Sequence, residues 1–185
     1  MVEWAIQCGC DGRCAFTAVI DCHDRTIVGW RLADSGKAIH AASALEEAIF
    51  KRKTEIQKGQ LVIRSDNGLV FGSTVFRQII NHYGLKQEYI TPYSPEQNGM
   101  IERFFRSMKE ECVWLHTFNS RDAAFSVISA WIEQYNHSRP HSQLNYLSPG
   151  EFRKLSRQKS ESASCTLRAF VHDASPKSLR QKAVR

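Results

Sequence analysis

The order of strand-like runs and helical repeats is the feature that most constrains the fold of this chain. Short apolar, β-branched runs predict strands, and apolar residues that recur every three or four positions predict helices. Three strands, a helix, a strand, a helix, a strand and two long helices are predicted in turn, at 4–10, 14–21, 26–32, 37–53, 61–63, 73–84, 87–91 and from caps at Ser94 and Ser120. Ser73 is expected to cap the helix at 73–84, and Phe125 is expected to point inward on the helix that begins at Ser120. The helix after Ser94 has an apolar stripe of Met100, Ile101, Phe104, Phe105 and Met108. This order favours an α/β domain in which one mixed five-stranded sheet has three antiparallel strands followed by parallel strands, with flanking helices.

Composition separates a folded part from a basic end. The chain has 185 residues, of which 42% are hydrophobic and 24% charged, as in a globular domain. Its formal charge is +6, but residues 153–185 hold nine Lys/Arg and two Asp/Glu, whereas 1–152 hold 16 basic and 17 acidic residues. We therefore expect a folded domain at 1–153 and a basic, Ser-rich flexible tail at 154–185. Any contact of the domain with nucleic acid must come from a local patch.

Membrane and metal-binding signals are weak in the first part of the chain. No apolar run reaches the length of a membrane span, and the first residues do not form a signal peptide, so a cytoplasmic location is expected. Four of the six cysteines are Cys8, Cys10, Cys14 and Cys22, without the two well-spaced pairs of a structural zinc site. We expect reduced cysteines that act as small hydrophobic residues on strands.

Two carboxylates, Asp66 and Glu102, are separated by 35 residues and fall on different predicted elements. Asp66 follows the strand at 61–63 and precedes Asn67-Gly68, a tight-turn signal that presents the acid at a strand end. Glu102 falls in a helical pattern. Acids that the fold brings together can hold Mg²⁺ for phosphoryl transfer. Either acid alone is better explained as a solvated charge or a helix cap.

Basic residues follow Glu102 on nearly the same helix face. Arg106 and Lys109 recur at one and two helical turns after the acid. Cations beside a metal site can hold a phosphate backbone. The alternative is an exposed helix face whose cations are balanced by Glu110 and Glu111.

An ordered series of motifs resembles the integrase-core transposases of bacterial insertion sequences, relatives of retroviral integrases. The motifs are Ser65-Asp66-Asn67-Gly68, the segment Thr91–Gly99, and Ile101-Glu102-Arg103 with Lys109 downstream. The segment that closes such domains is matched by Tyr135-Asn136, Arg139-Pro140-His141, Leu144-Asn145-Tyr146 and Ser148-Pro149. The resemblance covers about residues 10–152.

The resemblance implies a ribonuclease-H-like fold and an enzyme of DNA transposition, integration and recombination. Such enzymes cleave and transfer DNA strands with Mg²⁺ or Mn²⁺ held by an Asp-Asp-Glu triad, and they act as homo-multimers on element ends and target DNA. Asp66 matches the second acid and Glu102 the third, which makes both catalytic metal ligands. The residues implied to contact DNA or position its phosphates are Lys109, Arg106, Arg103, Asn67, Gln97 and Asn98.

The chain departs from the family pattern at the first acid. Counting back 18 or 19 residues from the position matching Asp21 reaches Val2 or Glu3, where the family has Asp. Glu3 is a candidate substitute, whereas Asp11 fits a hairpin turn better than a triad position. The DNA-recognition region that usually precedes this domain is missing too. We therefore expect an N-terminally truncated copy, with the first strand cut short, whose metal-dependent cleavage is weak or nil.

Two other functions are compatible with these motifs. One is a non-catalytic nucleic-acid-binding remnant, which joins a full-length transposase as an inactive subunit. The other is a nuclease of RNA–DNA hybrids, which shares the metal chemistry but is disfavoured because residues 135–149 resemble transposases in particular.

Overall fold

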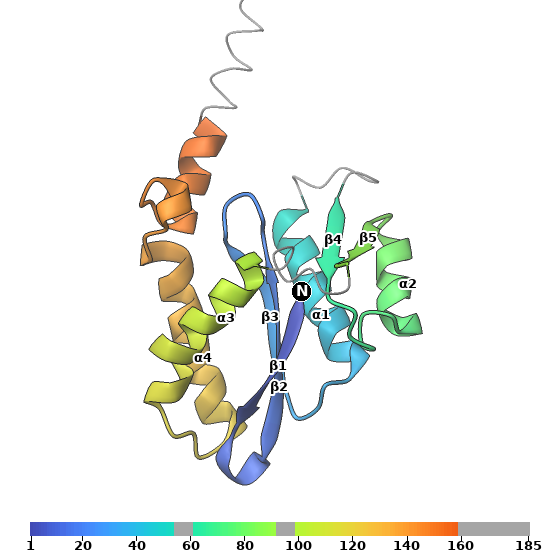
Figure 1. The fold of residues 1–185 in the computed structure, drawn as a ribbon, viewed down its shortest axis with the longest axis vertical. Helices are drawn as coiled ribbons and strands as arrows, with labels where there is room; N and C mark the ends of the chain where they lie inside the picture. The colour runs from blue at the N-terminus through green and yellow to red at the C-terminus, as the bar shows by residue number, and fades with distance from the viewer. Residues whose placement is uncertain (54–60, 92–98, 159–185) are drawn as a thin grey trace, which may run out of the picture.

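The chain is described by a computed structural model in which residues 1–53, 61–91 and 99–158 are placed, except for the side chains of Val2 and Glu3. The strands are β1 (Val2–Gln7), β2 (Arg13–Ile20), β3 (Ile27–Ala33), β4 (Val62–Ser65) and β5 (Lys86–Tyr89). The α-helices are α1 (Ala38–Arg52), α2 (Thr74–His82), α3 (Gly99–Glu111) and α4 (Arg121–Ser138), and residues 149–158 are also helical. Short 3₁₀ turns are η1 (Gly9–Asp11), η3 (Val113–Leu115) and η4 (Ser142–Leu144) (Figure 1).

The strands form two hydrogen-bonded ladders that meet at Met1. Strands β1, β2 and β3 make an antiparallel meander, and β4 pairs in parallel with β5. The amine of Met1 donates to the carbonyl of Arg64 at 2.6 Å, and the main-chain N–H of Asp66 donates to the carbonyl of Met1 at 3.4 Å. These bonds place the beginning of β1 against the end of β4. The predicted α/β fold, with antiparallel strands first and parallel strands later, is confirmed.

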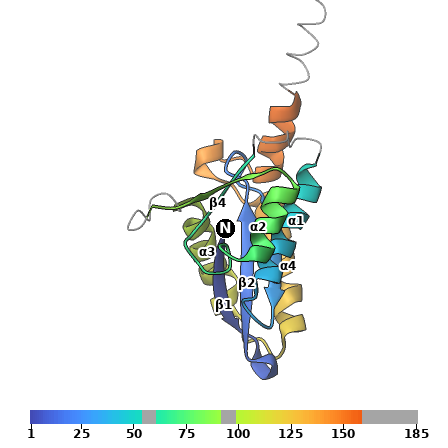
Figure 2. The ribbon, with the colours of Figure 1, turned by 90° about the vertical axis from the view of Figure 1, so that its right-hand side faces the viewer.

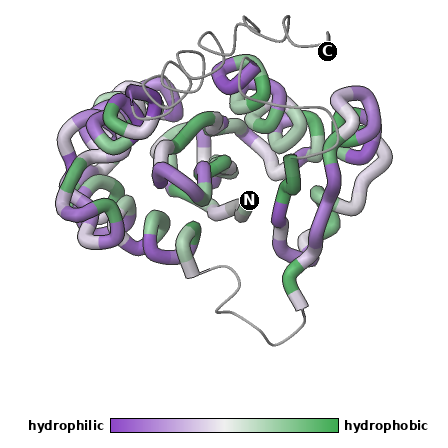
Figure 3. Tube along the Cα trace, turned by 90° about the horizontal axis from the view of Figure 1, so that it is seen from above, coloured by the Kyte–Doolittle hydropathy of each residue, from purple (hydrophilic) through white to green (hydrophobic). Residues whose placement is uncertain are grey.

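Helices cover the three-stranded ladder on both sides. Helices α3 and α4 lie on one side, and α1 lies on the other with β4, β5 and α2 beyond it (Figures 1 and 3). Helix α1 approaches β3 closely at Gly29, where a Cβ atom would lie 2.1 Å from the carbonyl oxygen of Ala44. Each side has its own apolar cluster, so the sheet is buried on both faces.

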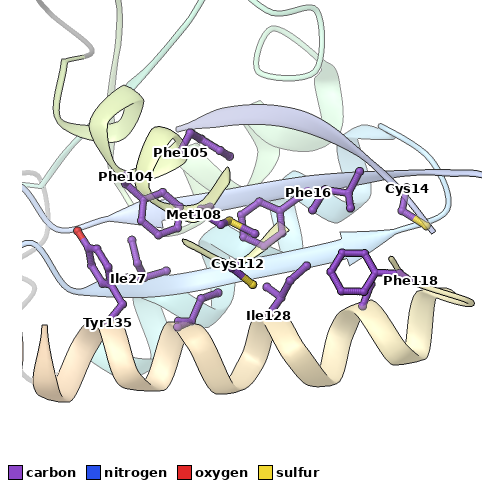
Figure 4. Packing of buried hydrophobic residues seen from close by; sticks show 14 of the residues in the cluster. Cys14, Phe16, Ile27, Phe104, Phe105, Met108, Cys112, Phe118, Ile128 and Tyr135 are labelled. Atoms are coloured by element: carbon purple, nitrogen blue, oxygen red, sulfur yellow. The ribbon is translucent and has the colours of Figure 1, made fainter. Parts of the chain in front are cut away.

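The cluster on the α3 side is rich in aromatic side chains. Phe104 and Met108 from α3 meet Phe16 of β2 and Ile128 and Tyr135 of α4 (Figure 4). The predicted apolar stripe of α3 is therefore the face that packs on the sheet. Burial of these side chains provides the main driving force for fixing α3, the helix that carries Glu102.

Three cysteines contribute to the same cluster as small hydrophobic residues: Cys8, Cys14 and Cys112 are buried in it. Cys10 and Cys22 are exposed, and of these five cysteines only Cys14 lies on a strand, so the expectation of strand-borne hydrophobic cysteines is met only in part. Burial raises the pKa of the Cys8 thiol to about 12 and that of Cys112 to about 11. These thiols are therefore protonated and poorly nucleophilic at neutral pH.

Local capping signals are confirmed at two helices. The Ser73 hydroxyl accepts the N–H of Phe76 at 3.2 Å, and the Ser120 hydroxyl accepts the N–H of Ala123 at 3.2 Å. Helix α2 ends before Gly84, whose φ of 64° suits a residue without Cβ. The cap predicted at Ser94 lies outside the described residues.

Two details differ from the expectations. Phe125, predicted to point inward on α4, is 48% exposed; its ring packs on Trp30 at the sheet surface, with centroids 4.9 Å apart. The helix at 149–158 crosses the expected boundary at 153/154, so ordered structure continues to Gln158. The division into a domain and a flexible tail, and the shortened first strand, stay predictions. Among the described helices, none has the length and apolarity required to cross a bilayer.

Candidate active site

Asp66 lies directly after the last residue of β4. Its Oδ1 atom accepts the main-chain N–H of Gly68 at 2.9 Å, an Asx turn that fixes the carboxylate at the strand end. A Cβ atom at position 68 would lie 2.9 Å from the same oxygen, so the turn is fitted to glycine. Asn67 donates its side-chain amide to the carbonyl of Ile90 at 3.1 Å, which ties the ends of β4 and β5 together. The second carboxylate oxygen of Asp66 is thus left for another ligand.

Glu102 occupies the first turn of α3, where the helix dipole favours a negative charge. Its side chain is exposed and forms no hydrogen bond or ion pair with the described residues. An acid that stays unpaired among several arginines is available to an external cation.

The beginning of β1 lies between α3 and strand β4 in the views of Figures 1 and 3, and Figure 2 shows β4 beside the N-terminus. The strand that leads to Asp66 and the helix that carries Glu102 therefore flank the same end of β1. No three His, Cys, Asp or Glu side chains are gathered as metal ligands in the described ranges. Glu3 pairs through its main chain with Thr17 in the β1–β2 ladder, and its side chain is not among the described ones.

The donor chemistry of the two described acids fits Mg²⁺ or Mn²⁺. Carboxylate oxygens are hard ligands, and Mg²⁺ is commonly held by one or two of them together with water and substrate phosphates. Asp66 keeps one carboxylate oxygen free of hydrogen bonds, and Glu102 keeps both, within the described structure.

Basic side chains surround this part of α3. Lys109 lies with its ammonium nitrogen 4.6 Å from the ring centroid of Trp4 on β1, which places it against the sheet. Arg103 and Arg106 are exposed and have no ion pair among the placed residues. The predicted Gln97 and Asn98 lie outside the described residues.

A cavity on the other side of α3 was not expected from the sequence. It has a volume of about 350 Å³ and is formed by the β2–β3 turn, α3, the end of α4 and the η4 segment. Its polar lining includes Arg25, Arg103, Ser107, Arg139, His141 and Ser142. The motif Arg139-Pro140-His141 is a signal that could have indicated it, but spacing alone does not connect this motif with Arg25 or Arg103.

Comparisons with protein families cover nearly the whole described chain. Residues 4–95 and 83–149 match two models that are both described as "Integrase core domain". The match at 4–95 includes Asp66, and the match at 83–149 includes Glu102 and the segment around Arg139.

Curated relatives come from bacterial insertion elements. An uncharacterized protein of insertion element IS136 from Agrobacterium fabrum is 30% identical over 137 residues, which are 72% of this chain and 70% of that protein. Transposase InsF of insertion sequence IS3A from Escherichia coli is 28% identical over 143 residues, 77% of this chain and 49% of the transposase. The chain spans still less of two longer insertion-element proteins, 32% and 26%.

The fold is that of integrase catalytic cores. The catalytic core domain of BIV integrase superposes with a TM-score of 0.56 at 16% sequence identity, covering 86% of this chain and 95% of the viral domain. At this identity the likeness concerns the fold, which is ribonuclease-H-like as the resemblance implied.

Proposed function

This chain belongs to the integrase core family of insertion-element transposases, and from that premise we propose that it is a catalytic core for DNA transposition and integration. The observation that carries the proposal is the placement of Asp66 at the end of β4 and Glu102 in the first turn of α3, two elements that flank the start of β1. The substrates would be the DNA of the element ends and of the target.

In this region the acidic side chains would bind the metal, and the basic and amide side chains would bind phosphate. Asp66 and Glu102 would hold Mg²⁺ or Mn²⁺, which supplies Lewis-acid stabilisation at phosphorus and activates the attacking oxygen. Lys109 and Arg106 would bind the phosphate backbone next to the scissile bond, and Arg103 would bind the backbone from the other side of α3, where it lines a cavity. Asn67, together with Gln97 and Asn98, which directly precede α3 in the sequence, would orient phosphate oxygens.

A homo-multimer on paired DNA ends is part of the same proposal. Two structures with a similar fold are assemblies: one is an intasome of simian T-cell lymphotropic virus, and the other is a trimeric form of the HTLV-2 integrase catalytic core domain in complex with magnesium. A multimer would allow two element ends to be processed together.

One observation favours a second candidate, a non-catalytic DNA-binding subunit. The position that holds the first acid of the family corresponds to Val2 or Glu3. Loss of one ligand from a shared metal site impairs chemistry more readily than folding. We therefore expect weak cleavage by this chain alone, and the Glu3→Asp variant should cleave faster if Glu3 stands at the position of the triad.

Metal titration and cleavage of element-end DNA test the two candidates. Calorimetry with Mg²⁺ is compared for the wild type, Asp66→Asn, Glu102→Gln and the control Asp34→Asn, whose exposed carboxylate is far along the chain from both acids. Metal binding and residual cleavage that disappear in the first two variants and persist in the control support the enzyme. DNA binding without any Mg²⁺ binding would overturn the catalytic assignment and leave the DNA-binding subunit.

A further inference from the structure

The cavity beside α3 is built from segments that are distant in the sequence. Arg25 comes from the β2–β3 turn, Arg103 and Ser107 from α3, Arg139 from the end of α4, and His141 from the segment that follows. These segments lie together at one end of the molecule (Figure 1). A cavity of about 350 Å³ is within the range that holds small ligands in proteins.

Positive charge in this cavity exceeds the negative charge that faces it. Arg139 forms an ion pair with Glu111 and donates to the hydroxyl of Ser107 at 3.3 Å. Arg25 donates to the main-chain carbonyl of Cys22 at 2.8 Å, and Arg103 has no ion pair or hydrogen bond in the described part of the chain. Within the described structure, the three guanidinium groups of the cavity are therefore opposed by one carboxylate, that of Glu111.

The acids nearest to Arg25 in the sequence are engaged elsewhere. Asp24 is buried and binds Arg52 and Arg153, and Asp21 lies 3.3 Å from Arg52. Neither carboxylate forms an ion pair with Arg25 within the placed residues. The two carboxylates of the β2–β3 turn therefore do not neutralise the positive charge of the cavity.

His141 gives independent evidence that the cavity lacks an anionic partner. Its Nε2 atom is buried and has no hydrogen-bond partner among the described residues. Its pKa is lowered by burial and by the charges of Arg139 and Arg25. Buried polar atoms in native proteins are usually hydrogen-bonded, so this nitrogen is suited to a ligand that brings its own oxygen atoms.

The chemistry of the lining selects a phosphate. Arginine presents a planar set of N–H donors that matches phosphate oxygens, and such charge-assisted hydrogen bonds are strong where water is partly excluded. Phe104 and Tyr135 form apolar parts of the wall, which lower the local dielectric. The volume leaves room for a phosphate together with part of its sugar.

Helix α3 connects this cavity with the candidate active site. Glu102 and Lys109 share one face of the helix, whereas Met100, Phe104 and Ser107 share another that lines the cavity. Arg103 follows Glu102 directly and reaches the cavity. A strand that crosses the exposed ridge of α3 could therefore reach both.

From these observations we propose that the cavity of Arg25, Arg103, Arg139 and His141 binds a phosphate group of the DNA strand held at the active site, a second anchoring point beside Asp66 and Glu102. The proposal rests on the proposed function for the identity of the DNA, but the phosphate site itself does not depend on metal chemistry.

The test measures DNA binding in EDTA, where the metal site is not involved. The full chain is compared with Arg25→Gln/Arg103→Gln and with the matched control Arg13→Gln/Arg77→Gln, which removes two exposed arginines outside the cavity. Affinity for a duplex with a single-stranded 3′ overhang is measured over a series of salt concentrations. Each lost phosphate contact should reduce the slope of log K against log salt by about 0.7–0.9. We expect the cavity pair to lose about 0.7–0.9 in slope, because one phosphate contact is lost, and at least tenfold in affinity, and the control pair to lose little.

Equal losses in both pairs, or no loss in the cavity pair, would overturn the proposal. Inorganic phosphate provides a second measurement. If phosphate raises the melting temperature of the wild type but not that of the cavity variant, and the two proteins bind DNA with the same affinity, the cavity binds a free anion and the DNA assignment is wrong. Circular dichroism verifies that each variant folds, and Arg25→Lys/Arg103→Lys should recover much of the binding. If the chain binds no Mg²⁺ but still binds DNA with the expected dependence on salt and on the cavity arginines, the result counts against the proposed function alone.

Discussion

Asn136 of α4 makes a two-way hydrogen-bonded pair with the main chain of Ile27 on β3. Its Oδ1 atom accepts the N–H of Ile27 at 2.8 Å, and its Nδ2 atom donates to the carbonyl of the same residue at 3.1 Å. Both bonds are buried, so the side chain acts as a substitute for a neighbouring strand at the start of β3. This explains in physical terms why an asparagine follows Tyr135 in the segment that closes the domain.

Asn136→Ala should destabilise the fold. The substitution leaves a buried N–H and a buried carbonyl without partners, and each such group costs about 1–3 kcal/mol, so a loss of about 2–4 kcal/mol in the free energy of unfolding is expected. Urea unfolding followed by circular dichroism provides the measurement. Gln134→Ala, at an exposed site of the same helix, should change stability by less than about 0.5 kcal/mol. Equal effects of the two substitutions would contradict the anchoring role.

The free energy of unfolding should also depend strongly on the ion network around Asp24. Asp24 is 2% exposed and accepts two hydrogen bonds from Arg52, at 2.8 and 3.0 Å, and one from Arg153 at 3.1 Å. Asp24→Asn removes the charge and leaves the cations with less compensation in a buried place, which typically costs about 3–5 kcal/mol. Asp34→Asn at an exposed position is the control. A loss below about 1 kcal/mol for Asp24→Asn would show that water already screens this network.

Contact between Lys109 and Trp4 predicts a measurable coupling across α3 and β1. A cation over an indole ring contributes about 0.5–1 kcal/mol at a partly exposed site. Trp4→Leu, Lys109→Met and the double variant form a thermodynamic cycle, with unfolding free energies measured in urea. A second cycle with Arg106→Met in place of Lys109→Met should give no coupling. If both cycles give the same value, the ammonium group is not held by the ring.

Local patterns in the sequence were sufficient for the elements and for the two acids. Ser73 and Ser120 are confirmed as caps because a cap depends on residues within one turn. The apolar stripe of α3 is confirmed because helical periodicity fixes which side chains share a face. Asp66 could be placed at a strand end from its turn motif for the same reason.

Contacts between distant segments could not be predicted in this way. Arg25 and Arg139 meet around one cavity although more than a hundred residues separate them, and no periodicity connects them. Phe125 has the spacing of an inward residue but lies at the edge of the interface, where it covers Trp30 instead of entering the core. Such details depend on how α4 sits on the sheet, which the sequence pattern does not specify.

His141 should make the stability of the fold depend on pH. Burial and the charges of Arg139 and Arg25 lower its pKa below the ordinary value of 6.5. Between these two pKa values the unfolded chain binds more protons than the folded chain, so the free energy of unfolding rises with pH there. Stability is therefore retained above about pH 6.5 and is lost as the pH falls through 6.5 toward the lower, native pKa.

Urea unfolding between pH 7.5 and pH 5 checks this sign. The difference between wild type and His141→Gln isolates the histidine from other titrating groups, and the wild type should lose stability relative to the variant as the pH falls. His82→Gln, at an exposed position on α2, should follow the wild type. Since an anion in the cavity would favour the protonated imidazole, bound DNA should raise the pKa of His141, which the NMR chemical shift of its ring carbon reports. If the pKa of His141 rises on DNA binding in the wild type but not in Arg25→Gln/Arg103→Gln, the pH dependence is linked to the phosphate site. If the pKa of His141 is unchanged by DNA in both proteins, the pH dependence and the phosphate site are independent.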